Sequence, residues 1–99
     1  MNINLKQPIC NLKGEPLKDN EGEILTFGRA LANILAGSKT KGGMKLFILA
    51  KKCFEQDVIE IDKADLGLIK NEVKSSEVYS GILVTAQCEL LLEDIKEEE

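Results

Sequence analysis

Residues 26–37, with the sequence TFGRALANILAG, carry the local signals of a capped amphipathic helix. Thr26 is a favoured N-cap residue and Gly37 is of the type favoured just beyond a helix end, so the predicted helix spans residues 27–36. Phe27, Leu31 and Ile34 recur at spacings of three and four and therefore share one face. Because such a stripe has to be buried, the rest of the chain must supply a core around this helix.

The length of 99 residues suits one small domain, and the hydrophobic content of 43% is enough for one core and too high for a disordered chain. We predict the α+β class: an N-terminal β-hairpin and a short third strand packed against about four α-helices. Residues 1–95 are expected to form this single domain, and residues 96–99 an acidic C-terminal tail.

The hairpin is predicted over residues 2–18, where Ile3 and Leu5 alternate with polar residues as in a half-buried strand. Pro8 would interrupt the strand, and Gly14 supplies a residue suited to the turn. Residues 18–23 are predicted to form a polar loop, and residues 58–61 a β-branched strand that pairs with the hairpin. We identify no internal repeat in the sequence.

Three further helices are predicted, over residues 43–55, from residue 63 to Ser75 or Ser76, and over residues 77–94, with Asp62 as the N-cap of the middle one. The glycine-rich residues 37–43 are predicted to form a flexible linker. The apolar residues expected to face the core are Met44, Phe47, Ile48 and Phe54 in the helix over residues 43–55, Leu66, Ile69 and Val73 in the helix that follows Asp62, and Tyr79, Ile82, Leu83, Ala86, Leu90 and Leu91 in the last helix.

The chain has no histidine, the commonest general base and the commonest neutral metal ligand. Cys10, Cys53 and Cys88 are far apart in the sequence, form no CxxC pair and have apolar neighbours, which indicates buried, reduced thiols. The alternative is a reactive Cys53, whose pKa the neighbouring Lys51 and Lys52 would lower. We expect no metal ion, no cofactor and no enzymatic activity.

The formal net charge of −4 hides a strong segregation of charge along the chain. Residues 24–54 hold six basic residues and no acid, whereas residues 55–99 hold four lysines and thirteen acids. The basic segment could be a contact surface for phosphates or for an acidic partner. The alternative is that the basic and acidic regions face each other across the fold or are solvated independently. The candidate contact residues are Arg29, Lys39, Lys41, Lys45, Lys51 and Lys52.

No apolar stretch approaches the roughly 20 residues that a membrane-spanning helix needs. The first residues, MNINLKQP, lack the apolar region of a secretory signal. Together with the unpaired cysteines, these features predict a protein of the cytoplasm.

Three stretches together resemble one known group of proteins: NLKGEPLKDNEGEILTFGRALANIL, KLFILAKKCFEQDVIEIDKADLGLIKNEV and YSGILVTAQCELLLE. The chain resembles small proteins of uncharacterised role that tailed bacteriophages and prophages encode, and the likeness covers about residues 8 to 93. The resemblance implies a virion-morphogenesis or accessory role in the bacterial host cell, and it identifies no catalytic residue.

Three functional hypotheses follow. The first is an accessory or assembly-associated protein that acts by binding a phage or host protein. The second is a small nucleic-acid-associated regulator that uses the basic residues between positions 29 and 52. The third is a homodimer that hides apolar surface on the last helix, where Leu90, Leu91 and Leu92 cannot all face one core.

Overall fold

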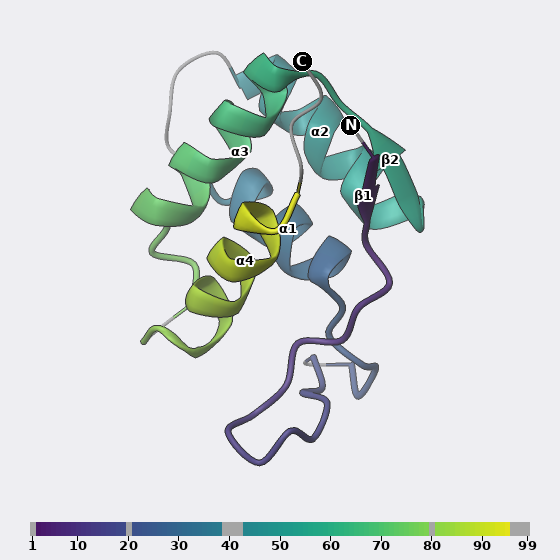
Figure 1. The fold of residues 1–99 in the computed structure, drawn as a ribbon, viewed down its shortest axis with the longest axis vertical. Helices are drawn as coiled ribbons and strands as arrows, with labels where there is room; N and C mark the ends of the chain where they lie inside the picture. The colour runs from purple at the N-terminus through teal and green to yellow at the C-terminus, as the bar shows by residue number, and fades with distance from the viewer. Residues whose placement is uncertain (1, 20, 39–42, 80, 96–99) are drawn as a thin grey trace.

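Helices make up most of the fold, which we describe from a computed structural model covering residues 2–19, 21–38, 43–79 and 81–95. In this part of the chain four helices and two strands occur (Figure 1). Their order is β1 (Asn2–Asn4), α1 (Phe27–Ala36), α2 (Gly43–Glu55), β2 (Val58–Glu60), α3 (Lys63–Ser75) and α4 (Leu83–Glu93). The α+β prediction is therefore confirmed, with two strands in place of three.

Helix α1 has the predicted bounds and lies at the centre of the molecule, packed against α2, α3 and α4 (Figure 1). Its N-terminus is capped by Thr26, whose hydroxyl accepts a hydrogen bond from the Arg29 backbone N–H at 3.2 Å. At the other end the Gly37 N–H donates to the Asn33 carbonyl at 3.0 Å. The buried residues of α1 are Phe27, Gly28, Ala30, Leu31, Ala32, Ile34 and Leu35.

The sheet consists of β1 and β2, which pair in antiparallel orientation. Ile3 lies opposite Ile59 in the register, and both side chains are buried in the core. The flanking residues of both strands are exposed, so the short sheet covers the core with one face and meets solvent with the other.

The predicted N-terminal hairpin is confirmed only at its turn, where Gly14 has a positive φ and Cys10 and Pro16 form an antiparallel bridge. Strand β1 pairs with β2 and not within the hairpin, and Ile9, Leu17 and Leu25 lie side by side, joined by a ring of backbone hydrogen bonds. Ile9 N–H donates to the Leu25 carbonyl, Leu17 N–H to that of Ile9, and Leu25 N–H to that of Leu17, each at 2.8 Å. The ring divides residues 9–25 into two successive loops of equal length. Because each junction forms only isolated bridges, no third strand develops among the described residues.

The two loops are copies of each other at a spacing of eight residues, so the expectation of no internal repeat is wrong. Asn11 begins the first turn and Asp19 the second, and the Oδ1 atom of each accepts hydrogen bonds from the backbone N–H groups two and four residues ahead, at 2.9 and 3.0 Å. Gly14 and Gly22 stand at matching positions with φ of +85° and +81°, the left-handed conformation that favours glycine. The two loops therefore contain the same type of turn.

Helix α3 follows its prediction closely. The Asp62 carboxylate caps it by accepting a hydrogen bond from the Asp65 N–H at 2.7 Å, and Ser76 ends it. The predicted stripe of Leu66, Ile69 and Val73 is buried.

The prediction for the last helix is wrong in its start and in its buried face. Helix α4 begins at Leu83, because Gly81, with φ of +75°, interrupts the chain before it. Its buried residues are Val84, Cys88 and Leu92, whereas Ile82 and Leu90 are 78% and 62% exposed. Tyr79, Leu83, Ala86 and Leu91, also expected toward the core, are half-buried, and of these Tyr79 and Leu91 pack against it.

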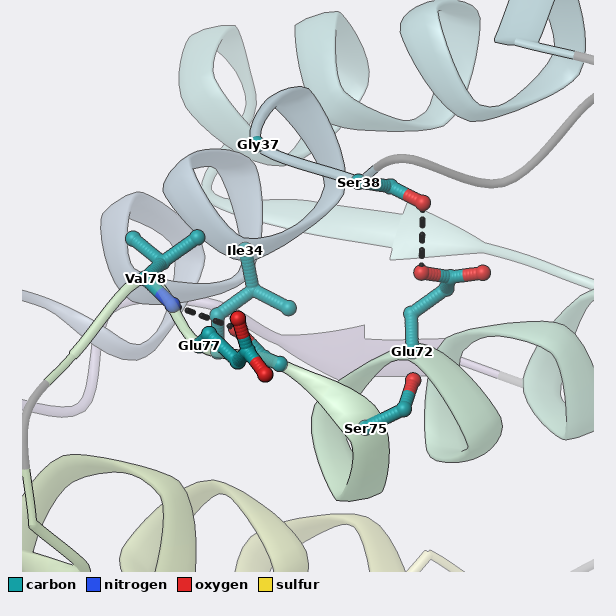
Figure 2. A pocket seen from close by; sticks show the side chains of 8 residues that line it. Ile34, Gly37, Ser38, Glu72, Ser75, Glu77 and Val78 are labelled. Atoms are coloured by element: carbon teal, nitrogen blue, oxygen red, sulfur yellow. Dashed lines mark hydrogen bonds between the residues drawn. The ribbon is translucent and has the colours of Figure 1, made fainter.

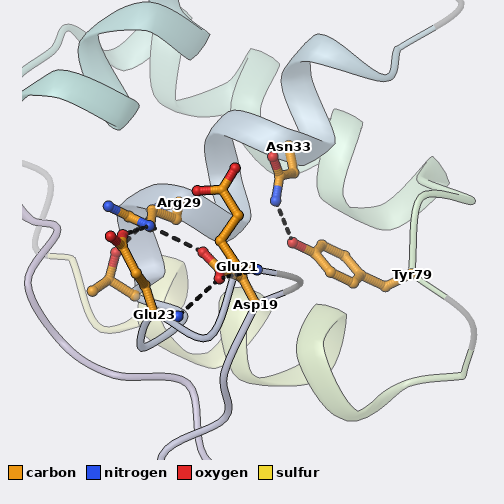
Figure 3. A network of polar contacts seen from close by, with 7 residues as sticks. Asp19, Glu21, Glu23, Arg29, Asn33 and Tyr79 are labelled. Carbon is orange, nitrogen blue, oxygen red and sulfur yellow. Dashed lines mark hydrogen bonds and ion pairs between the residues drawn. The ribbon is translucent and has the colours of Figure 1, made fainter.

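Tyr79 lies in the connection between α3 and α4, and its hydroxyl accepts a hydrogen bond from the Asn33 side-chain amide at 2.8 Å (Figure 3). None of the helices formed by the described residues is long and apolar enough to cross a membrane.

Candidate functional site

The candidate basic residues have different environments, and Lys39 and Lys41 lie outside the described residues. Arg29 is part of a polar network that fixes the second of the two repeated loops (Figure 3). Its Nη1 lies 3.0 Å from the Asp19 carboxylate and also pairs with Glu23. Its guanidinium carbon lies 5.5 Å from the centroid of the Phe54 ring, a cation–π contact with α2. Arg29 therefore holds the loop against α1 and α2.

The charges of this network support one another. The backbone N–H of Glu23, and after it that of Glu21 and the Arg29 guanidinium, lower the pKa of the Asp19 carboxyl below its usual value. The hydrogen bond to Glu23 is the main reason that the pKa of Arg29 is raised. At neutral pH Asp19 and Arg29 are thus ionised and paired.

Lys45 also has an acidic partner within the fold. Its Nζ lies 2.8 Å from Oδ1 of Asp65, a buried oxygen, so this ion pair joins the first turns of α2 and α3. The hydrogen bond to Asp65 raises the pKa of Lys45. Lys51 and Lys52 are exposed, and no ion pair joins either of them to another described residue.

The predicted core face of α2 is wrong, and the error reveals an exposed apolar surface. Met44, Phe47, Ile48 and Phe54 are 74%, 62%, 48% and 61% exposed. The buried residues are instead Leu46, Leu49, Ala50 and Cys53. We call Met44, Phe47, Ile48 and Phe54, together with Lys51, the outer face of α2.

Both stripes of α2 have helical spacing and lie on opposite sides of the helix. The inner stripe packs against α1, so the outer face is directed away from the core. Soluble monomers rarely expose contiguous apolar patches of this kind unless they bind something there.

A cavity of about 730 Å³ adjoins the outer face. Met44, Ile48 and the buried Leu49 form its apolar wall, and Lys45, Lys52 and Asp65 provide its polar edge. A cavity with an apolar wall and basic groups at its edge can bind an apolar side chain of a partner that has carboxylates beside it. Sequence reasoning named both lysines but missed the cavity, because it assigned Met44 and Ile48 to the core.

A second cavity, of about 650 Å³, lies between the C-terminal ends of α1 and α3 (Figure 2). Glu72 lines it and is only 7% exposed, and the Ser38 hydroxyl donates a hydrogen bond to its carboxylate at 2.7 Å. This contact joins the ends of two helices and gives the buried carboxyl group a hydrogen-bond partner. The only sign of this burial in the sequence is that Glu72 directly precedes Val73, on the buried stripe of α3.

Two of the three cysteines, Cys53 and Cys88, are buried. Burial raises the pKa of the Cys53 thiol to about 11 and that of Cys88 to about 12, so both stay protonated at neutral pH. The expected lowering of the Cys53 pKa by Lys51 and Lys52 is thus wrong, since desolvation raises it. Cys10 is half-buried. Over the described ranges no group of three or more acidic or cysteine side chains could hold a metal ion.

Comparison with known proteins adds no relative: no family model, no curated protein and no solved structure matches this chain.

Proposed function

We propose that the protein acts by binding another protein through the outer face of α2, without a catalytic step. The observation that carries this proposal is the exposure of Met44, Phe47, Ile48 and Phe54 on one side of a helix whose other side already fills the core. Helix faces of this type are a common mode of protein recognition.

The chemistry of the surface specifies the partner. Lys51 lies within the outer face and Lys52 at the edge of the adjoining cavity, and both lack ion-pair partners in the described part of the chain. The partner surface should therefore be apolar and flanked by carboxylates. Together with the resemblance to phage and prophage proteins, this supports an accessory or assembly-associated role, with a phage or host protein as partner in the bacterial cytoplasm.

The nucleic-acid hypothesis is the weaker one. Arg29 and Lys45, two of its candidate contact residues, are already paired with carboxylates. Phosphate contacts from these residues would require breaking those ion pairs. The outer face also presents more apolar than basic side chains, unlike a typical nucleic-acid surface.

The test uses three forms of the purified protein: wild type, the double variant Phe47→Ala/Ile48→Ala, and Leu12→Ala as a control. Leu12 is 96% exposed and lies in the first repeated loop, away from α2, so the control removes an exposed apolar residue elsewhere. Partners are captured from induced lysogens, purified, and titrated against each form by calorimetry.

Wild type and Leu12→Ala should bind the purified partner with equal affinity, and the α2 double variant at least tenfold more weakly, the effect expected for loss of an apolar anchor. Equal binding by all three forms would refute the proposal. So would a measured catalytic turnover that the α2 double variant retains in full.

A further inference from the structure

The α2 surface calls for a partner with an exposed apolar residue beside acidic ones, and this chain carries such a surface itself. On α4, Leu90 is 62% exposed and is followed after three and four residues by Glu93 and Asp94. This spacing places all three on neighbouring positions of the helix surface. Val84 and Cys88 lie on the opposite side of α4, in the core.

The carboxylates of this surface are available for a contact. Glu93 and Asp94 are exposed, and neither is within 4.0 Å of a lysine or arginine in the described ranges. Lys70 and Lys74 of α3 share a small cleft with Glu93, but they form no ion pair with it. The C-terminal half of the chain also holds most of its acidic residues.

The two surfaces cannot bind each other within one molecule. Helix α1 packs against both α2 and α4 (Figure 1). The outer face of α2 and Leu90 on α4 are both exposed. A contact between them therefore joins two molecules. Symmetric contacts are disfavoured by charge, because α2 against α2 brings Lys51 and Lys52 together, and α4 against α4 brings the carboxylates together.

We propose that the occupant of the α2 surface is α4 of a second copy of this chain. Leu90 inserts into the cavity beside Met44 and Ile48, and Glu93 and Asp94 face Lys51 and Lys52. The contact is head-to-tail, so a pair of copies leaves one α2 surface and one α4 surface free, and association continues into a ring or an open chain. This inference rests on the proposed function, since it names the partner of the same surface.

The test measures self-association by sedimentation over a concentration series up to the millimolar range, because a contact built on one inserted side chain should be weak. Wild type should associate beyond the dimer as concentration rises. Leu90→Ala should lower the association constant about tenfold or more. Leu12→Ala should leave it unchanged. Circular dichroism confirms that each variant is folded, as expected for changes at exposed positions.

Charge exchange identifies the two surfaces. The double variants Lys51→Glu/Lys52→Glu and Glu93→Lys/Asp94→Lys should each stay monomeric, because each carries the same charge on both surfaces. Mixed in equal amounts, they should associate again to about the wild-type extent. Higher salt should weaken association of wild type and of the mixture alike.

Three results would overturn the inference. Wild type could remain monomeric throughout the series, the mixture could fail to associate, or the α4 changes could leave association intact. In each case the capture experiment decides the proposed function separately: a phage or host protein lost with Phe47→Ala/Ile48→Ala would be the occupant in place of the second copy.

Discussion

Gly28 controls how closely α1 approaches the rest of the core. A Cβ atom at this position would lie 2.6 Å from the Cys53 carbonyl oxygen of α2 and 2.8 Å from the Leu5 Cβ atom. Both are closer than real Cβ contacts, and the carbonyl belongs to a helix backbone that cannot move independently. The close approach of the neighbouring backbone thus requires glycine at position 28, and the sequence alone does not show this requirement.

We expect Gly28→Ala to lower the free energy of unfolding by about 1–3 kcal/mol, the usual cost of overpacking. Gly67→Ala is the matched control, because Gly67 lies inside α3 with no atom within 4 Å of its added Cβ. That change should raise stability by about 0.5–1 kcal/mol through helix propensity. Urea unfolding followed by circular dichroism measures both. A Gly28→Ala protein as stable as wild type would contradict the packing argument.

Asp19 makes the stability of the second loop depend on pH. Its pKa is lowered in the folded state, so its stabilisation is present above the unfolded pKa of about 3.9 and is lost as pH falls through the folded value. Asp19→Asn keeps the turn, because Asn11 performs the same turn role in the first loop, but removes the charge that faces Arg29.

The Asp19→Asn variant should therefore be less stable than wild type at neutral pH. The difference should shrink as pH falls from about 4 through the lowered folded pKa, where the wild-type carboxyl becomes protonated. Urea unfolding at a series of pH values measures it. Asn11→Asp is the control, since its side chain has no arginine partner in the described part of the structure. A difference that is constant with pH would show that Asp19 acts through the turn alone.

At the scale of elements, α2 shows how two apolar stripes compete for the core. The inner stripe includes the smaller side chains Ala50 and Cys53, and the backbone at Cys53 lies close to Gly28 of α1. Both stripes fit the helical period equally well, so periodicity alone cannot choose between them. Packing against α1 decides which of the two stripes is buried.

Neighbouring residues of α2 should therefore respond differently to truncation. Leu46→Ala, on the inner stripe at 3% exposure, should cost about 2–5 kcal/mol of unfolding free energy by leaving a cavity. Phe47→Ala, on the outer face at 62% exposure, should change it by about 0.5 kcal/mol or less. Thermal or urea unfolding compares them. A Phe47→Ala loss equal to that of Leu46→Ala would place Phe47 in the core after all.

At the scale of the whole molecule, the segregated charges are partly neutralised across the fold. Arg29 pairs with acids from the second loop and Lys45 pairs with α3, so the basic segment is not a uniform cationic strip. Among the described candidates, Lys51 and Lys52 remain unpaired. The surface left by this pairing is apolar with two lysines, which suits a protein better than a polyphosphate.

This distribution predicts weak binding to duplex DNA with a shallow salt dependence. Two phosphate contacts give a log–log slope of about −2, whereas use of most of the six candidate residues gives about −4 to −5. Fluorescence anisotropy with labelled DNA between low and moderate salt measures the slope. A slope near −5, abolished by Lys51→Glu/Lys52→Glu, would favour the nucleic-acid hypothesis over the protein partner.

The local signals in the sequence determined much of this protein, and contacts between distant residues decided the rest. Thr26, Gly37 and Asp62 mark helix ends by hydrogen bonds to their own neighbourhood, so α1 and α3 were predictable. The buried sides of α2 and α4 were not, because they depend on what packs against each helix. The same holds for the candidate site: the lysines could be named from the sequence, but their pairing and the exposure of the outer face exist only once α1, α2 and α3 are packed together.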